Sequence, residues 1–102
     1  MDTNSDLASQ FAKLQPPLQD PALLEALASV EHERWAHWQR YMHEQCVPGQ
    51  EAGTLVIPAE LVTRWARQFR TPYEELPEDE RTSDKEQVLE YLKTINAHLD
   101  LG

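Results

Sequence analysis

The sequence predicts an all-α fold, a small helical domain in which a long first helix packs against two shorter helices. Apolar residues recur at helical spacing along most of the chain, and prolines stand where helices would begin or end. A chain of 102 residues has room for one domain and little surplus of buried surface, so we also expect an oligomer. We interpret residues 1–19 as a flexible N-terminal arm and residues 20–102 as the single helical domain.

The long helix follows this arm. The arm itself has three apolar residues at helical spacing before a proline pair, namely Leu7, Phe11 and Leu14, then Pro16 and Pro17. Asp20 then offers an N-cap, and Pro21 suits the first helical turn. Because no helix breaker occurs before Pro48, we predict a helix from Pro21 to about Cys46.

A loop and a second helix come next. Residues 47–57 hold two glycines and the apolar run Leu55-Val56-Ile57, which predicts an extended segment that crosses the core. Pro58 opens a second helix that continues to about Arg70. The helix ends there because the residue before Pro72 avoids helical angles.

The last helix is expected to start at a capping box. A single helical turn over residues 77–81 precedes Ser83 and Glu86, which have the capping spacing, and the helix then runs to about His98. Its inward face is predicted from apolar residues three and four apart, namely Val88, Tyr91, Leu92, Ile95 and Leu99. Asp84 at the helix start either caps the helix or holds an arginine in place.

Charge and composition restrict the class of partner. The formal net charge of −9 argues against duplex nucleic acid, whose binding requires many lysines and arginines, whereas a ligand with a few phosphates stays compatible. Cys46 is the single cysteine, so nothing indicates an oxidising compartment. Residues 1–19 lack the apolar stretch of a signal peptide or a membrane span. We therefore expect a cytoplasmic protein that makes no membrane contact.

A basic and aromatic run distinguishes this acidic chain, Arg64-Trp65-Ala66-Arg67-Gln68-Phe69-Arg70. Arginine matches phosphate and carboxylate groups and stacks on rings, so the run suits a small site for an anionic aromatic ligand. Helical spacing places Arg64 and Gln68 along one side of Trp65, whereas Arg67 points away from the core, into solvent or an interface. The alternative is a surface helix whose arginines pair with neighbouring glutamates.

The long helix carries a second group of candidates. Its inward stripe contains Trp35 and Trp38, and Glu31 falls in the middle of that stripe. A buried carboxylate needs a partner, for which Arg34 is the near candidate and Arg64 the distant one. Alternatively, Glu31 lies near an exposed helix end or in an oligomer seam, where a polar residue fixes the register.

His32 lies beside Trp35 on the flank of the same helix. It either donates to a nearby backbone or carboxylate group or contacts a ligand. Together with His37 it suggests a zinc protease motif, but five residues put the two rings about 140° apart around a helix. Because one metal ion needs both rings on one face, we expect no metal site.

Two segments carry a family resemblance. The stretch from Pro72 to Lys85 (PYEELPEDERTSDK) resembles the closing segment of Ry domains, modules named from ryanodine receptors and also found alone in bacteria and phages. The run from His32 to Trp35 (HERW) is similar to the histidine, glutamate and tryptophan helix motif of that family. The glycine and tryptophan turn usual in Ry domains is replaced by the loop around Gly53 and the helix that follows it. This variant resembles a group of short phage and prophage proteins.

The resemblance implies a nucleotide ligand. Prokaryotic Ry-like domains are associated with nucleotide signalling in antiviral defence, which suggests a cyclic nucleotide or an adenine-containing derivative of NAD. Tryptophan faces can stack a base for roughly 1–3 kcal/mol each, and arginine can bind a phosphate. The predicted ligand contacts are His32, Arg34, Trp35, Trp38, Arg64, Trp65, Gln68 and Tyr73, and the predicted polar cluster consists of Glu31, Ser83 and Asp84.

The leading interpretation is a non-enzymatic, homo-oligomeric protein that sequesters a small nucleotide second messenger, in the host cytoplasm if a phage encodes it. We expect no cofactor. We also expect no enzymatic activity, because the sequence shows no nucleophile with a matched base, no phosphate loop and no metal-ligand spacing. The alternative is a protein interaction module of a phage or prophage that acts on a host protein, with the tryptophans and arginines as its hot spot.

Overall fold

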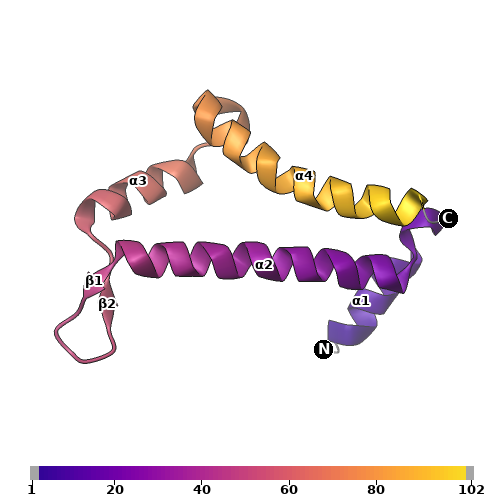
Figure 1. The fold of residues 1–102 in the computed structure, drawn as a ribbon, viewed down its shortest axis with the longest axis horizontal. Coiled ribbons are helices and arrows are strands. Elements are labelled where there is room, and N and C mark those ends of the chain that lie inside the picture. Colours follow the sequence, from indigo (N-terminus) through magenta and orange to yellow (C-terminus); the bar gives the residue numbers. More distant parts are fainter. Residues whose placement is uncertain (1–2, 101–102) are drawn as a thin grey trace.

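The computed structural model describes residues 3–100 and is mostly helical (Figure 1). Four α-helices account for most of this range, and a two-stranded hairpin and two short 3-10 turns connect them. The helices are α1 (Thr3–Ala12), α2 (Pro21–Gln45), α3 (Ala59–Arg70) and α4 (Glu78–Asp100). The strands are β1 (Val47–Pro48) and β2 (Leu55–Val56), and the 3-10 turns are Pro16–Leu18 and Tyr73–Glu75. The predicted helical class is therefore confirmed.

The long helix α2 has the predicted bounds to within one residue. Asp20 accepts a hydrogen bond from the backbone N–H of Ala22 at 2.9 Å, and Pro21 occupies the first turn. The helix ends where Cys46 leaves helical angles and donates its N–H to the carbonyl of His43 at 3.2 Å. Local capping chemistry thus fixes both ends of α2.

The prediction that residues 47–57 cross the core is wrong. Strands β1 and β2 pair antiparallel, with Val47 opposite Val56, and form a hairpin that projects beyond the end of α2 (Figure 1). The Gly49 N–H donates to the Thr54 carbonyl at 2.8 Å, and Gly53 supplies the left-handed turn with a φ of 84°. The segment closes on itself through these local bonds, so its apolar side chains stay exposed.

Helix α4 is longer than predicted. It begins at Glu78, where the N–H groups of Glu80 and Arg81 donate to the Pro77 carbonyl, and it continues unbroken to Asp100. Ser83 and Asp84 therefore lie inside the helix, and the predicted capping box and N-cap role there are both wrong. The physical reason is that no glycine or proline interrupts residues 78–100, so the turn at 77–81 simply propagates.

A short connection joins α3 to α4. Thr71 and Pro72 end α3 as predicted, and the 3-10 turn that follows is held by two backbone bonds, from Glu75 to Pro72 at 2.9 Å and from Leu76 to Tyr73 at 3.1 Å. Pro77 then starts α4. A proline thus fixes the backbone at each end of this connection.

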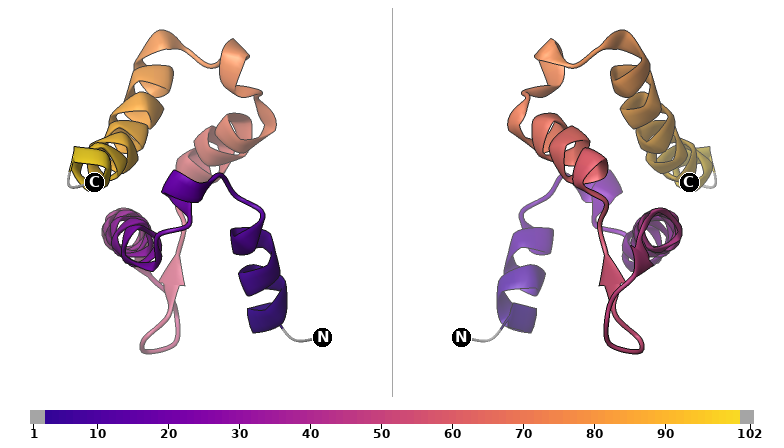
Figure 2. Two further views of the ribbon diagram at one scale, coloured as in Figure 1. Left: turned by 90° about the vertical axis from the view of Figure 1, so that its right-hand side faces the viewer. Right: turned by 90° about the vertical axis from the view of Figure 1, so that its left-hand side faces the viewer.

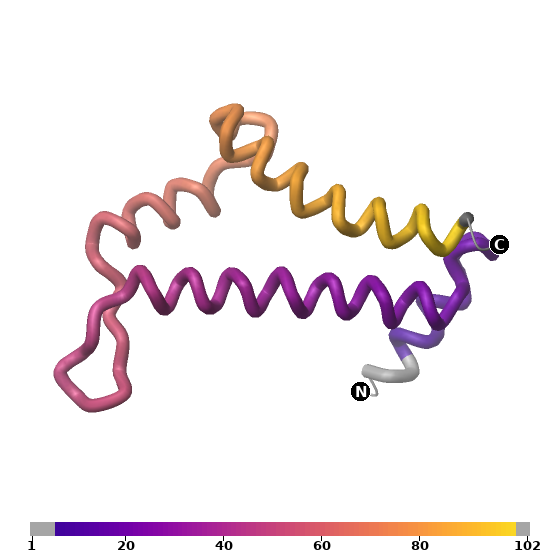
Figure 3. Tube along the Cα trace, viewed as in Figure 1, coloured from indigo at the N-terminus to yellow at the C-terminus, as the bar shows by residue number. Residues whose placement is uncertain are grey.

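The helices enclose an open triangle rather than a compact bundle. Helix α4 runs antiparallel to α2 and lies closest to the first half of α2, while α3 crosses above the other end of α2 (Figures 1 and 2). The Cα trace shows the same arrangement, with α1 beneath the start of α2 (Figure 3). The radius of gyration is 18.3 Å, compared with about 13 Å expected for a compact chain of this length.

The core is correspondingly small. Among the side chains of residues 6–99, Leu23 in α2 and Leu61 in α3 are the only buried hydrophobic ones, at 3% and 6% exposure. Several residues predicted to face inward are exposed instead, namely Trp35, Trp38, Val88, Leu92 and Leu99. Helical phase predicted that these residues share faces, but the open packing leaves those faces uncovered.

Hydrogen bonds from Gln19 close the turn between α1 and α2. The side-chain nitrogen of Gln19 donates to the carbonyls of Ala12 and Leu14, both at 2.7 Å, which folds the turn between α1 and α2 back on itself. Flexibility of residues 1–19 stays a prediction.

Within residues 3–100, no helix combines the length and the apolar character that crossing a bilayer requires.

Truncating a core leucine should destabilise the chain far more than truncating its neighbour. Leu61→Ala removes buried methyl groups and should lower the free energy of unfolding by about 2 kcal/mol or more. Val62→Ala, at a half-exposed position one residue later, should cost less than about 1 kcal/mol. Chemical denaturation followed by circular dichroism measures both values, and equal losses would contradict the assignment of Leu61 to the core.

Candidate functional site

A groove lies where α2, α3 and the first turns of α4 meet. Its volume is about 680 Å³, and its walls are lined by Arg34, Trp38, Trp65, Gln68, Phe69, Leu76, Glu80, Ser83 and Asp84. It brings together four of the predicted ligand contacts, Arg34, Trp38, Trp65 and Gln68, with two members of the predicted polar cluster, Ser83 and Asp84. The size is within the range of small-molecule sites.

The aromatic wall joins α2 to α3. The rings of Trp38 and Trp65 meet edge to face, with centroids 5.3 Å apart and planes at 68°. Tyr41 lies tilted against Trp38 at 5.6 Å, so the Trp38 ring is held from two sides. Trp65 is half-buried, whereas Phe69 at the far end of the wall is 76% exposed, with the Arg70 guanidinium 5.7 Å from its ring centre. The wall therefore offers fixed aromatic surface that a planar ligand could cover.

A polar network anchors Arg34 between α2 and α4. The Arg34 Nε donates to Glu31 Oε2 and to the Tyr91 hydroxyl, both at 3.2 Å, and Nη2 forms an ion pair with Glu31 Oε1. The Tyr91 hydroxyl also donates to Glu31 Oε2. The Arg34 hydrogen bond, followed by the Tyr91 one, lowers the pKa of Glu31, and the same contacts raise the pKa of Arg34. Arg34 thus presents a guanidinium in a fixed position at the groove.

The opposite wall is acidic. Glu80 Oε2 accepts a hydrogen bond from Arg67 Nη2 at 2.9 Å, which ties α3 to α4. The other carboxylate oxygen, Oε1, is buried and has no hydrogen-bond partner among the described residues. A buried acceptor without a donor is costly, and because this oxygen has almost no exposed surface, a ligand could donate to it only if the Glu80 side chain moved. Asp84 adds a second carboxylate one helical turn later.

The structure separates the arginines of α3 differently from the sequence prediction. Arg64 is exposed and does not line the groove, whereas Arg67, predicted to point into solvent or an interface, contacts Glu80 on the groove wall. The crossing of α3 over α2 turns the Arg67 side of α3 toward α4. Glu31 likewise pairs with Arg34 and Tyr91 and not with Arg64, at a position that is exposed rather than buried.

The remaining predicted contacts lie outside the groove. His32 stacks on Trp35, with centroids 6.1 Å apart and planes at 24°, and His32 lines a separate polar hollow beside Arg34. Tyr73 lines a third hollow along the outer side of α4. Glu80 was missed by the sequence analysis. Glu80 follows Arg67 by thirteen residues across the proline-bounded turn, and this spacing indicates a contact only once the packing of α3 against α4 is known.

Comparison with protein-family models, with curated proteins and with solved structures finds no match to this chain. The Ry resemblance therefore rests on its motifs alone. Within residues 3–100, no three histidine, cysteine, aspartate or glutamate side chains come together as they would around a metal ion.

Acid should weaken the link between α2 and α4 through Glu31. Because the folded-state pKa of Glu31 lies below its ordinary value of 4.5, the stabilisation is complete above pH 4.5 and is lost as pH falls through the lower value. The thermal midpoint, followed by circular dichroism between pH 7 and pH 3, should therefore fall more steeply for the wild type than for Glu31→Gln.

The matched control is Glu33→Gln, which removes an exposed carboxylate from the same helix. It should follow the wild-type pH profile. Identical profiles for Glu31→Gln and Glu33→Gln would show that the network with Arg34 and Tyr91 does not stabilise the fold.

Proposed function

We propose that this chain is a non-enzymatic binding protein that holds a small nucleotide in the groove between α2, α3 and α4. The observation that carries the proposal is the combination, in one groove, of the Trp38 and Trp65 rings, the fixed guanidinium of Arg34 and the carboxylates of Glu80 and Asp84. A nucleotide has a matching group for each, namely a flat base, a phosphate, and hydroxyl or amino donors.

The aromatic wall supports a base. Stacking on an aromatic side chain is worth roughly 1–3 kcal/mol per base and tolerates any base, because every base has a π face. Since Tyr41 and Trp65 hold the Trp38 ring, little side-chain freedom would be lost on binding.

The charges on the groove walls restrict the class of ligand. One arginine, Arg34, faces two carboxylates, Glu80 and Asp84, across the groove. A ligand with several clustered phosphates would be repelled by the acidic wall, whereas one with few phosphates and exposed hydroxyl or amino groups could use both walls. This balance favours a cyclic nucleotide or an adenine-containing derivative of NAD over a triphosphate.

The biological role proposed is sequestration of such a signal during bacterial antiviral defence. Its support is the resemblance of the segments at residues 32–35 and 72–85 to Ry domains, and of the variant with the loop around Gly53 to a group of short phage and prophage proteins. Sequestration needs binding without turnover, and the groove walls named above contain no serine, cysteine or histidine paired with a base.

Removing the Trp38 ring should abolish most of the binding. We expect isothermal calorimetry against a panel of cyclic oligonucleotides and ADP-ribose derivatives to find at least one ligand bound more tightly than about 10 μM. Trp38→Ala should weaken that affinity about tenfold or more. Trp35→Ala removes an exposed tryptophan of the same helix that does not line the groove, so the affinity should stay within about twofold.

Two outcomes would contradict this proposal. One is the absence of any binding tighter than about 10 μM across the panel. The other is an equal loss for Trp35→Ala and Trp38→Ala, provided that circular dichroism shows both variants folded. Mass spectrometry of the recovered ligand tests the non-enzymatic part, because a binder returns it intact.

A second candidate function is a protein interaction module that acts on a host protein. It is favoured by the exposure of Phe69, the most exposed large apolar side chain among residues 6–99, at the far end of the groove. Comparison of Phe69→Ala with Trp38→Ala distinguishes the two candidates. A nucleotide site centred on Trp38 should lose more affinity in Trp38→Ala, whereas a protein interface centred on Phe69 should lose more in Phe69→Ala.

A further inference from the structure

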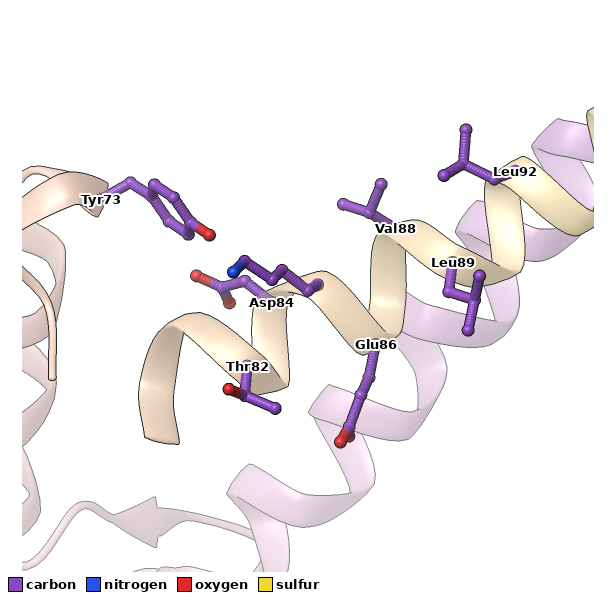
Figure 4. Close-up of a pocket in the computed structure, with 8 residues that line it drawn as sticks. Tyr73, Thr82, Asp84, Glu86, Val88, Leu89 and Leu92 are labelled. Carbon is purple, nitrogen blue, oxygen red and sulfur yellow. The ribbon is translucent and has the colours of Figure 1, made fainter. Parts of the chain in front are cut away.

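Helix α4 carries apolar side chains on two sides, and only one of them has a partner. Tyr91, Ile95 and His98 are half-buried on the side that faces α2. On the other side stand Val88, Leu89, Leu92 and Leu99, all 46–55% exposed. Figure 4 shows Val88 and Leu92 pointing away from α2. A helix with apolar residues on both sides is normally covered on both sides.

The uncovered side is shaped as a shallow hollow. Tyr73, from the turn before α4, lies at one end of it, and Val88, Leu89 and Leu92 form its floor, with a volume of about 670 Å³ (Figure 4). Polar residues border it at the start of α4, among them Asp84, Lys85 and Glu86. An apolar centre with a charged border is the usual anatomy of a protein interface.

The surface area of the chain indicates how much is left uncovered. The accessible surface is 8369 Å², whereas a folded monomer of 11.8 kDa exposes about 5,900 Å². The difference, about 2,500 Å², exceeds the roughly 800 Å² that each partner of a stable dimer buries. A second copy could therefore cover the outer side of α4 and leave the groove accessible.

The spacing on α4 suits a second copy of the same helix. Val88 and Leu92 lie four residues apart on the outer side, so in an antiparallel pair centred between them each Val88 would pack against the partner's Leu92. In a two-fold dimer the same surface faces itself, so the patch must be self-complementary. A seam of aliphatic residues fulfils this condition.

The charges beside the seam determine whether the two α4 helices pair parallel or antiparallel. Glu86 and Lys93 are seven residues apart and lie on the same flank of α4, next to Leu89. In an antiparallel pair centred near Leu89, Glu86 of each copy would face the partner's Lys93. In a parallel pair in register, like charges would meet instead. The existing contact of Lys93 with Glu90 is long, at 3.4 Å, and both side chains are well exposed, so Lys93 can exchange it.

We propose that the protein is an antiparallel homodimer formed by the outer side of α4, with Val88, Leu89 and Leu92 at its centre and Glu86 paired with the partner's Lys93. This proposal is independent of the nucleotide proposal, because it concerns a different surface and is tested without ligand.

Sedimentation velocity of the full chain at about 50 μM tests it directly. The wild type should sediment as a species with twice the 11.8 kDa mass of one chain. Leu92→Glu buries a charge in the seam and should weaken the dimer about 100-fold or more, giving a monomer. The matched control Val62→Glu places the same charge at an apolar position of α3 with similar exposure, outside the α4 hollow and the groove, and should leave the dimer intact. A monomeric wild type, or equal effects of the two variants, would overturn the proposal.

A charge exchange tests the antiparallel arrangement of the two α4 helices. Its result does not depend on whether the Leu92→Glu variant folds. Lys93→Glu would place four like charges at the interface and should weaken the dimer about tenfold. The double variant Glu86→Lys with Lys93→Glu should restore it. Failure of the double variant to restore the dimer would overturn the antiparallel arrangement, and calorimetry on the same samples shows separately whether the groove still binds nucleotide.

Discussion

The antiparallel contact between α2 and α4 is the interaction on which the other features depend. Besides the buried Leu61, two side chains in the second half of α3 make contacts to other helices, the Trp65 ring against Trp38 and the Arg67 guanidinium on Glu80. The second of these contacts exists only where α4 is in place. The network of Glu31, Arg34 and Tyr91 fixes α4 to α2 at the level of the groove. If that pair separated, the groove would lose its acidic wall and its arginine would lose its support.

Capping residues and prolines in the sequence were sufficient to predict the helix ends that they determine. Asp20 and Pro21 marked the start of α2, and Pro72 marked the end of α3. The start of α4 was misplaced because Ser83 has the right chemistry for a cap, whereas Pro77 was already able to start the helix. The hairpin was missed because its pairing depends on the contact of Gly49 with Thr54, which two-residue strands do not reveal in the sequence.

The candidate site was predictable as far as helical phase determines it. Trp65 and Gln68 lie one turn apart on α3, and both line the groove, as does Trp38 on the facing helix. Which arginine of α3 pairs with Glu80 of α4 depends on the angle at which α3 crosses its neighbours, and periodicity contains no information about that angle. The same limit applies to α4, where the sequence shows two apolar sides and does not indicate which one meets α2.

The connection between α3 and α4 has a consequence for the speed of binding. Pro72 and Pro77 restrict its backbone, and the hydrogen bonds from Glu75 and Leu76 close the turn between them. The two groove walls that it joins are therefore pre-positioned, with no flexible hinge between them. A ligand would enter without waiting for a domain to close, and its association rate would approach that set by diffusion and orientation.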